Sequence, residues 1–199
     1  NDYDVVIKLI TTKNDNFFVC MRLCSIQDNR FAYRKNVLPT SMHPSQAALI
    51  VSLAKPYLKE TAQIMDPFCG VGTLLIERAH LVPAREIYAT DTYGDAITMG
   101  RENAAFAKTR INFIHRDFFD FRHDYKFDEL ITDMPVRNRQ TKAEMELFYE
   151  RFFDKAAEHL VSGGIIVMYS NEIGFVKKQI RLRVEYLSLI HISEPTRPY

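Results

Sequence analysis

The chain has 199 residues, of which 47% are hydrophobic, and a formal net charge of +1. This length suits one globular domain with a sizeable core, and the near-zero charge gives no global field that would attract nucleic acid. Three scattered cysteines fit a reducing compartment and argue against a disulfide framework. Without a long apolar run or a cleavable signal, the sequence predicts a soluble cytoplasmic protein with no membrane partner and no metal.

Alternating apolar residues near the N-terminus predict a β-hairpin, YDVVIKLITT and FFVCMRLCS, with the polar break KNDN between them. A connector follows, RFAYRKNVLPTSMHPS. The next segment, residues 45–57, predicts an amphipathic helix, with Ser45 as its cap and Ala48, Leu49 and Leu53 on its apolar face. The chain has no initiator Met and opens inside a strand-like pattern, so we expect a fragment of a longer protein.

Beyond this helix the chain repeats one unit, a short apolar strand followed by a helix. The predicted strands are QIMDPF, EIYATD, INFIHRD, FDELITDMP and GGIIVMYS. The predicted helices span residues 73–79, 93–107, 142–160 and 173–181. Strands too apolar to face water, in alternation with helices, predict an α/β fold with a doubly wound, mostly parallel sheet that is covered on both faces.

Aspartates stand at the ends of four successive predicted strands: Asp66, Asp91, Asp117 and Asp133. Ligands of such sheets bind beyond the carboxyl ends of the strands, so four acids in register are expected to converge on one crevice. The alternative for any single one is that it caps the helix after its strand.

The stretch DPFCGVGTLLIER raises the question of what its turn holds. A dinucleotide-binding turn reads G-x-G-x-x-G, whereas here Gly70 and Gly72 are followed by a leucine at the third position. Asp66 at the mouth of the turn would repel a phosphate and attract an ammonium. Asp91 lies at the spacing at which an acid accepts ribose hydroxyls, and Asp117 precedes two phenylalanines that could flank an adenine. These features together point to S-adenosylmethionine.

The motifs DPFCGVGTLLIER, YATD, HRDFFDF and ITDMP, in this order, resemble those of class I S-adenosylmethionine-dependent methyltransferases. The resemblance runs from about Phe31 to Arg181 and includes the connector. It is to an RNA methylase family in which this Rossmann-like domain is often fused to an RNA-binding THUMP domain. The resemblance implies a set of cofactor-binding residues: Asp66, Pro67, Cys69, Gly70, Gly72, Thr73, Asp91, Asp117 and Phe118.

Three segments are predicted: residues 1–44 as N-terminal hairpin and connector, 45–186 as methyltransferase domain, and 187–199 as a tail. The tail includes LSLIHISEPTR, which resembles the translation of a transposase adapter used in preparing DNA sequencing libraries; a genuine strand is the alternative. The resemblance also implies that an N-terminal RNA-binding domain and the C-terminal hairpin of a complete domain are missing.

The stretch DMPV, from Asp133, stands where the family commonly carries Asn or Asp, two prolines and an aromatic residue. An exocyclic amine is a poor nucleophile while its lone pair is delocalised into the ring. Asp133 and the carbonyl of Met134 can accept its two protons, while Pro135 stiffens the turn, so these three are the predicted catalytic residues. The valine cannot stack on a base, and Phe118 or Tyr33 is the expected substitute.

Members of the family methylate the exocyclic N2 amine of guanine in tRNA or rRNA, and that is the predicted function. A non-catalytic nucleotide-binding or RNA-binding domain is one alternative, and methylation of a protein amide or a small-molecule amine is another. Basic residues in RNRQTK, after Pro135, can hold RNA phosphates or belong to a solvated loop. Cys69 is interpreted as a small residue in a tight turn, and His43 either reaches the cofactor or caps the helix.

Overall fold

The computed structural model describes residues 5–11, 16–22, 29–136 and 139–183. Contacts divide the chain into two compact units, residues 1–32 and 33–199, which are described separately. The first unit holds an antiparallel hairpin of β1 (Val6–Thr11) and β2 (Phe17–Arg22), as predicted. The predicted tail, residues 187–199, lies outside the described residues.

The second unit alternates strands and helices in the predicted order. Its elements are α1 (Pro44–Ala54), η1 (Lys55–Tyr57), β3 (Gln63–Asp66), α2 (Thr73–Leu81), β4 (Glu86–Asp91), α3 (Gly94–Phe106), β5 (Asn112–His115), η2 (Phe118–Asp120), β6 (Phe127–Asp133), α4 (Lys142–His159), β7 (Leu160–Tyr169) and α5 (Ile173–Leu182). No helix among the described residues is long and apolar enough to cross a membrane.

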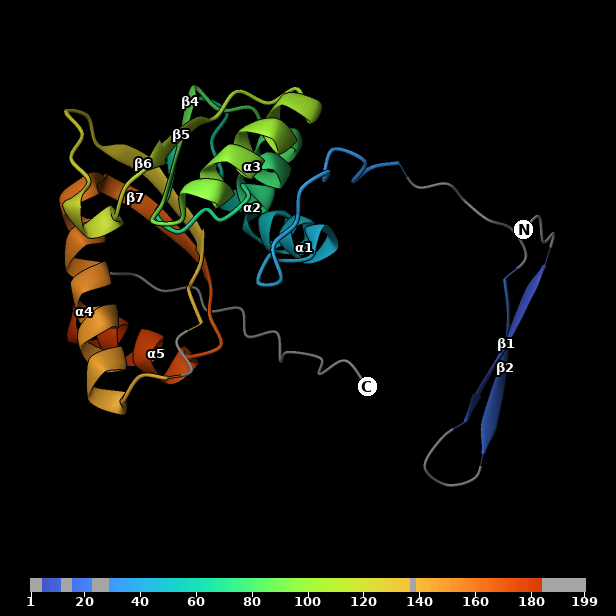
Figure 1. The fold of residues 1–199 in the computed structure, drawn as a ribbon. Helices are drawn as coiled ribbons and strands as arrows, with labels where there is room; N and C mark the ends of the chain where they lie inside the picture. Colours follow the sequence, from blue (N-terminus) through green and yellow to red (C-terminus); the bar gives the residue numbers. More distant parts are fainter. Residues whose placement is uncertain (1–4, 12–15, 23–28, 137–138, 184–199) are drawn as a thin grey trace. The chain divides into compact units, whose positions relative to one another are not determined.

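The five strands of this unit form one parallel sheet in the order β5-β4-β3-β6-β7. The chain builds outward from β3 to β5 and then returns to the other side of β3, so the strand order reverses between β3 and β6. Figure 1 shows α1, α2 and α3 on one face of the sheet and α4 and α5 on the other. The predicted doubly wound architecture is therefore confirmed, and the reversal marks where a ligand site is expected.

Helix α1 differs in two details from the prediction. Its cap is His43, whose side chain accepts a hydrogen bond from the Ser45 N–H, so the capping alternative for His43 is confirmed. The buried face consists of Pro44, Ala47, Val51 and Ala54, whereas Leu49 is 54% exposed and Leu53 is 43% exposed. The expected apolar face was wrong because the small residues let α1 and α2 approach closely, and that contact is made by the other side of the helix.

The turn between β3 and α2 depends on two glycines with positive φ. Gly70 has a φ of +50° and Gly72, the cap of α2, has a φ of +80°. A Cβ on Gly72 would also lie 2.8 Å from the ring of Phe113. Gly72 is therefore required by backbone conformation and by packing. At Gly70 a Cβ would meet nothing within 4 Å, so only the backbone conformation demands glycine there.

A buried ion pair joins the two sides of the strand reversal. The Arg78 guanidinium on α2 donates to both carboxylate oxygens of Glu129 on β6, each at 2.9 Å, and both side chains are almost fully buried. Arg78 also donates to the backbone carbonyl of Lys59. Such a bidentate pair fixes geometry more than it adds stability, because desolvation offsets much of the attraction. It holds α2, and hence the turn before it, against β6.

Candidate functional site

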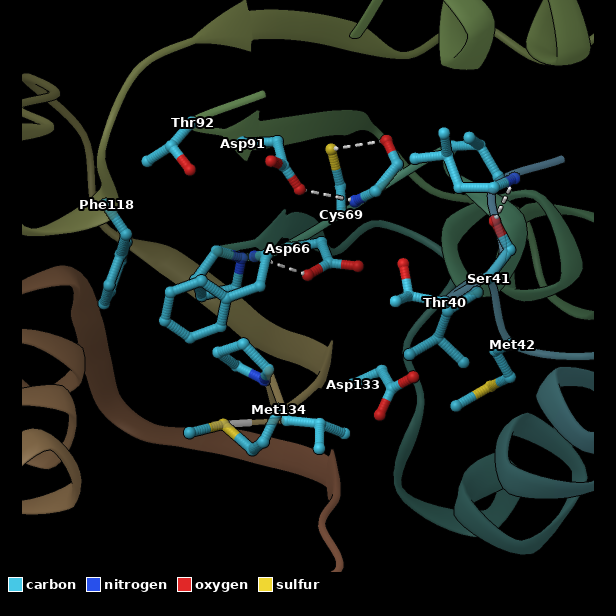
Figure 2. Close-up of a pocket in the computed structure, with 18 of the residues that line it drawn as sticks. Thr40, Ser41, Met42, Asp66, Cys69, Asp91, Thr92, Phe118, Asp133 and Met134 are labelled. Atoms are coloured by element: carbon cyan, nitrogen blue, oxygen red, sulfur yellow. Dashed lines mark hydrogen bonds between the residues drawn. The ribbon is translucent and has the colours of Figure 1, made fainter. Parts of the chain in front are cut away.

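A cavity of about 340 Å³ opens at the carboxyl ends of the strands, beside the strand reversal. Figure 2 shows Asp66, Asp91 and Asp133 around it, with Thr40, Ser41 and Met42 along one wall. All four strand-end acids line this one cavity, as predicted from their positions at the ends of successive strands. Of the predicted site residues, these line it: Asp66, Pro67, Cys69, Gly70, Thr73, Asp91, Asp117, Phe118, Asp133, Met134 and Pro135. Gly72 does not, for its role lies in the turn.

Asp66 ends β3 and is only 1% exposed. Its Oδ1 accepts hydrogen bonds from the Phe68 N–H at 3.0 Å and the Thr132 hydroxyl at 2.8 Å, while no described residue donates to Oδ2. Burial raises the pKa of this carboxyl to about 8, although the two hydrogen bonds lower it, and the carboxylates of Asp133 and Asp91 raise it further. Asp66 is therefore mostly protonated near neutral pH, and a cation bound beside it would favour the ionised form.

Replacing Asp66 by asparagine should change how the stability of the domain depends on pH. Asp66 titrates at about 8 in the folded domain and near 3.8 in an unfolded chain, so between those values the folded state holds a proton that the unfolded state has lost. The stabilisation from this group is complete below the unfolded pKa and is lost as the pH rises through the folded pKa. Asparagine does not titrate, and it keeps an oxygen for the bonds from Phe68 and Thr132.

We therefore compare the free energy of unfolding of Asp66→Asn with that of the wild type at two pH values. The difference in favour of the variant should be about 1 to 3 kcal/mol larger at about pH 8 than at about pH 5. Urea denaturation of the ligand-free proteins at the two pH values measures this difference. Equal pH dependence in the two proteins would contradict the raised pKa.

Asp91 ends β4 and binds the glycine turn. Its Oδ2 accepts a hydrogen bond from the Gly70 N–H at 2.8 Å, and its Oδ1 accepts one from the Tyr93 N–H at 2.9 Å. Each carboxylate oxygen has a second lone pair, so both oxygens can also accept from a ligand in the cavity. Asp91 can thus bind a ligand and hold the glycine turn in its conformation at the same time.

Asp117 follows β5 and caps η2, because its Oδ1 accepts a hydrogen bond from the Phe119 N–H at 2.9 Å. The capping alternative is confirmed for this acid, which also lines the cavity.

An aromatic wall continues from Asp117 along the cavity. The ring of Phe68 lies 6.0 Å from that of Phe118 and 5.8 Å from that of Phe148, centroid to centroid. Phe119 also lines the cavity, and the guanidinium of Arg151 lies 4.5 Å from its ring centroid. An acid beside a wall of rings suits a flat heterocycle that carries an amine.

Asp133 ends β6, across the strand reversal from Asp91. No described residue hydrogen-bonds its carboxylate, and burial raises the pKa of this carboxyl to about 6. The next residue, Met134, donates its N–H to the Tyr169 carbonyl at 2.9 Å, which fixes the start of the turn on β7. Val136 is 63% exposed at the edge of the cavity. Above a pH of about 6, Asp133 is an ionised acceptor with no hydrogen-bond partner in the described part of the chain.

Two further side chains of the turn indicate what the cavity can hold. The hydroxyl of Thr73, at the start of α2, is buried and has no hydrogen-bond partner among the described residues. A buried hydroxyl without a partner is costly, so a polar ligand group at that place would relieve the cost. Burial raises the pKa of the Cys69 thiol, which supports its interpretation as a small packing residue. The unpaired oxygens of Asp66 and Thr73 fit a zwitterionic ligand end.

The connector forms one wall of the cavity, which the sequence did not predict. Leu38, Thr40, Ser41 and Met42 line the cavity, although the connector suggested only His43, which caps α1 instead. The signal available in the sequence was that the resemblance extends through the connector. Phe148 of α4 was also missed, because nothing in a helical pattern says which ring reaches a cavity.

Tyr33, expected as a substitute for the missing aromatic residue, does not line the cavity. Its hydroxyl donates to Glu77 at 2.5 Å and the residue is 5% exposed, so it anchors the connector on α2. Phe118 does line the cavity but is 1% exposed and packed among other rings. No cluster of metal ligands occurs in the part of the chain that the structure describes.

The model of the UPF0020 family, described as the RMKL-like methyltransferase domain, matches residues 32–187. A tRNA (guanine(10)-N2)-dimethyltransferase of Methanothermobacter thermautotrophicus is 32% identical over 192 residues, covering 90% of this chain and 56% of that protein. A release factor glutamine methyltransferase of Lactococcus lactis is 25% identical over 155 residues, covering 68% of this chain and 56% of that protein. The chain thus spans just over half the length of either relative.

Among solved structures, TrmN from Thermus thermophilus is similar in fold. Its TM-score is 0.67 at 21% sequence identity, over 88% of this chain and 52% of that one. At this identity the likeness concerns the fold, which agrees with the parallel sheet described above.

Proposed function

Because this chain belongs to the RMKL-like methyltransferase family, we propose that it is an S-adenosylmethionine-dependent methyltransferase domain that acts on the exocyclic N2 amine of a guanine in tRNA or rRNA. The observation that carries the choice of substrate is the 32% identity, over 90% of the chain, to a tRNA (guanine(10)-N2)-dimethyltransferase. The Asp133 carboxylate lines the cavity and has no hydrogen-bond partner among the residues that the structure describes, which agrees with this choice because an amine needs an acceptor there.

The residues of the cavity fit the proposed cofactor. Asp66 and Thr73 carry unpaired oxygens for the charged amino acid end, and Asp91 would accept the ribose hydroxyls. Asp117 and Phe118 would flank the adenine. When bound, S-adenosylmethionine supplies the methyl group, which leaves its sulfonium sulfur and bonds to the guanine N2.

The turn after β6 would prepare the guanine amine. In this proposal the Asp133 carboxylate accepts one N–H of the amine and the Met134 carbonyl accepts the other, which favours a pyramidal nitrogen with its lone pair available. The bond from the Met134 N–H to Tyr169 holds this peptide in place, and Pro135 restricts the backbone after it. The proton released from nitrogen after transfer passes to solvent.

An RNA partner suits two exposed cations that follow the turn. Arg139 and Lys142 are exposed, and both could contact phosphates, whereas Arg137 lies outside the described residues. A cytoplasmic location stays a prediction of the sequence.

A second candidate substrate is a protein amide, which the similarity to a release factor glutamine methyltransferase favours. An amide nitrogen also has a delocalised lone pair and two protons, so the same acceptors would serve. The test offers RNA and protein fractions of a cell extract in parallel, with labelled S-adenosylmethionine, and digests labelled RNA to nucleosides. Label in N2-methylguanosine supports the proposal, and label in protein alone favours the amide. Cofactor binding without label in either fraction would favour a non-catalytic domain.

A further inference from the structure

The connector forms one wall of the cavity without secondary structure of its own. Residues 34–43 contain neither helix nor strand, yet four of them line the cavity. Backbone groups in such a segment need hydrogen-bond partners from elsewhere, because an unpaired buried N–H or C=O is costly. The position of this wall therefore depends on whichever side chains supply those partners.

Asn103 on α3 supplies several of them and is fully buried. Its Oδ1 accepts hydrogen bonds from the N–H groups of Lys35 at 3.0 Å and Asn36 at 2.9 Å. Its Nδ2 donates to the carbonyl of Asn36 at 2.9 Å and to that of Val71, in the glycine turn, at 3.4 Å. An amide can do this because it offers an acceptor and two donors on one planar group. One side chain thus joins the connector, α3 and the glycine turn.

The far end of the wall is held by a different residue. The Arg34 guanidinium donates to the carbonyls of Met42 at 3.0 Å and Ser41 at 3.4 Å. Between the two anchors, the Leu38 N–H donates to the Ser41 hydroxyl at 2.9 Å, which closes a local turn. The conformation of the wall is therefore set by hydrogen bonds within the connector, including those of Arg34. Its attachment to α3 and to the glycine turn is set by Asn103.

We propose that Asn103 is a positioning residue for the cofactor site. It does not line the cavity, but its hydrogen bonds connect the connector wall to the glycine turn, and both of these segments line the cavity. Asp91, the acid proposed to bind the ribose, ends β4, and helix α3 begins three residues later at Gly94. Without Asn103 the walls would occupy the binding-competent spacing for only part of the time, and the apparent affinity would fall by that fraction. The functional side of this inference rests on the proposed cofactor.

The test compares Asn103→Ala and Asn103→Asp with Asn36→Ala as a matched control. Asn36 donates its side-chain amide to Glu102 at 2.7 Å in an exposed bond between the same two segments, so its loss leaves the bonds of Asn103 intact. Aspartate preserves the volume of Asn103 and the acceptor for Lys35 and Asn36, but loses both donors. Binding of S-adenosylhomocysteine is measured by calorimetry, at a temperature where circular dichroism shows each variant folded. Amide hydrogen exchange is measured in parallel, without ligand.

We expect Asn103→Ala to bind S-adenosylhomocysteine about 10- to 100-fold more weakly than the wild type, and Asn36→Ala to bind within about twofold of it. Exchange should accelerate in the connector and the glycine turn but not in the central strands. Asn103→Asp should weaken binding too, yet keep the Lys35 and Asn36 amides protected. A general structural defect would instead accelerate exchange throughout the sheet.

Unchanged affinity and unchanged exchange in both Asn103 variants would overturn the inference and leave the proposed function standing. If the wild type itself binds no S-adenosylhomocysteine, the proposed cofactor fails, and exchange in the connector and turn alone decides whether Asn103 holds the two walls. Should Asn103→Ala not fold, Asn103→Asp carries the comparison, and normal binding by that variant would overturn the inference.

Discussion

Asp133→Ala is expected to lower the rate of methyl transfer by about a hundredfold or more at saturating cofactor. Asp133 is the one strand-end acid of the cavity whose carboxylate has no hydrogen-bond partner among the described residues. Its proposed partner is therefore the amine of the substrate. Alanine removes the acceptor and leaves the amine lone pair delocalised. Single-turnover transfer from labelled cofactor into RNA measures the rate. Cofactor affinity, measured by calorimetry, should stay near that of the wild type.

Asp133→Asn separates a positioning role from that of a charged base. Asparagine keeps one oxygen acceptor at the same reach, so positioning predicts substantial remaining activity, whereas a charged base predicts a loss as severe as with alanine. For a charged base the wild-type rate should fall as the pH drops below about 6, because the carboxyl then becomes protonated, whereas for positioning alone the rate should fall little, because the neutral carboxyl keeps an oxygen acceptor. The asparagine variant should lack this acidic limb.

The neighbouring proline gives an independent check of the same turn. Pro135→Gly should slow transfer by loosening the backbone that aims the Met134 carbonyl, while leaving cofactor binding intact. Full activity in both Asp133→Ala and Pro135→Gly would rule out this assignment of the catalytic turn.

Asp91→Ala is expected to weaken cofactor binding by about 2 to 4 kcal/mol. Two effects add here: the charge-assisted bonds to the ribose hydroxyls are lost, and the Gly70 N–H loses its acceptor at 2.8 Å, which loosens the glycine turn. Calorimetry with S-adenosylhomocysteine measures the loss. Asp95→Ala is the matched control, because Asp95 is an exposed acid in the first turn of α3, four residues after Asp91. In the described structure its side chain accepts a hydrogen bond only from the Tyr93 hydroxyl.

Unchanged affinity in Asp91→Ala would mean that Asp91 serves only the backbone and that the ligand lies elsewhere. A companion measurement uses NADH. Tight binding of that pyrophosphate cofactor would contradict the argument that Asp66 excludes a phosphate from the turn.

The sequence by itself determined the elements and the chemistry of the strand ends. Strand and helix bounds follow local periodicity, so β4 was predicted residue for residue and α4 to within one residue. The convergence of Asp66, Asp91, Asp117 and Asp133 was also predictable, because parallel strands bring their carboxyl ends to one edge wherever their order places them.

Only the tertiary structure decided which residues become neighbours when they are distant in the sequence. Helical periodicity allowed either face of α1 to be buried, and contact with α2 selected the face of Ala47 and Val51. The pKa of Asp66 depends on burial, which a motif does not reveal. Asn103 is an ordinary polar residue in a helical pattern until the connector, 67 and 68 residues earlier, is folded against it. Periodicity is a property of the chain, whereas burial and hydrogen-bond partners are properties of what the chain meets after folding.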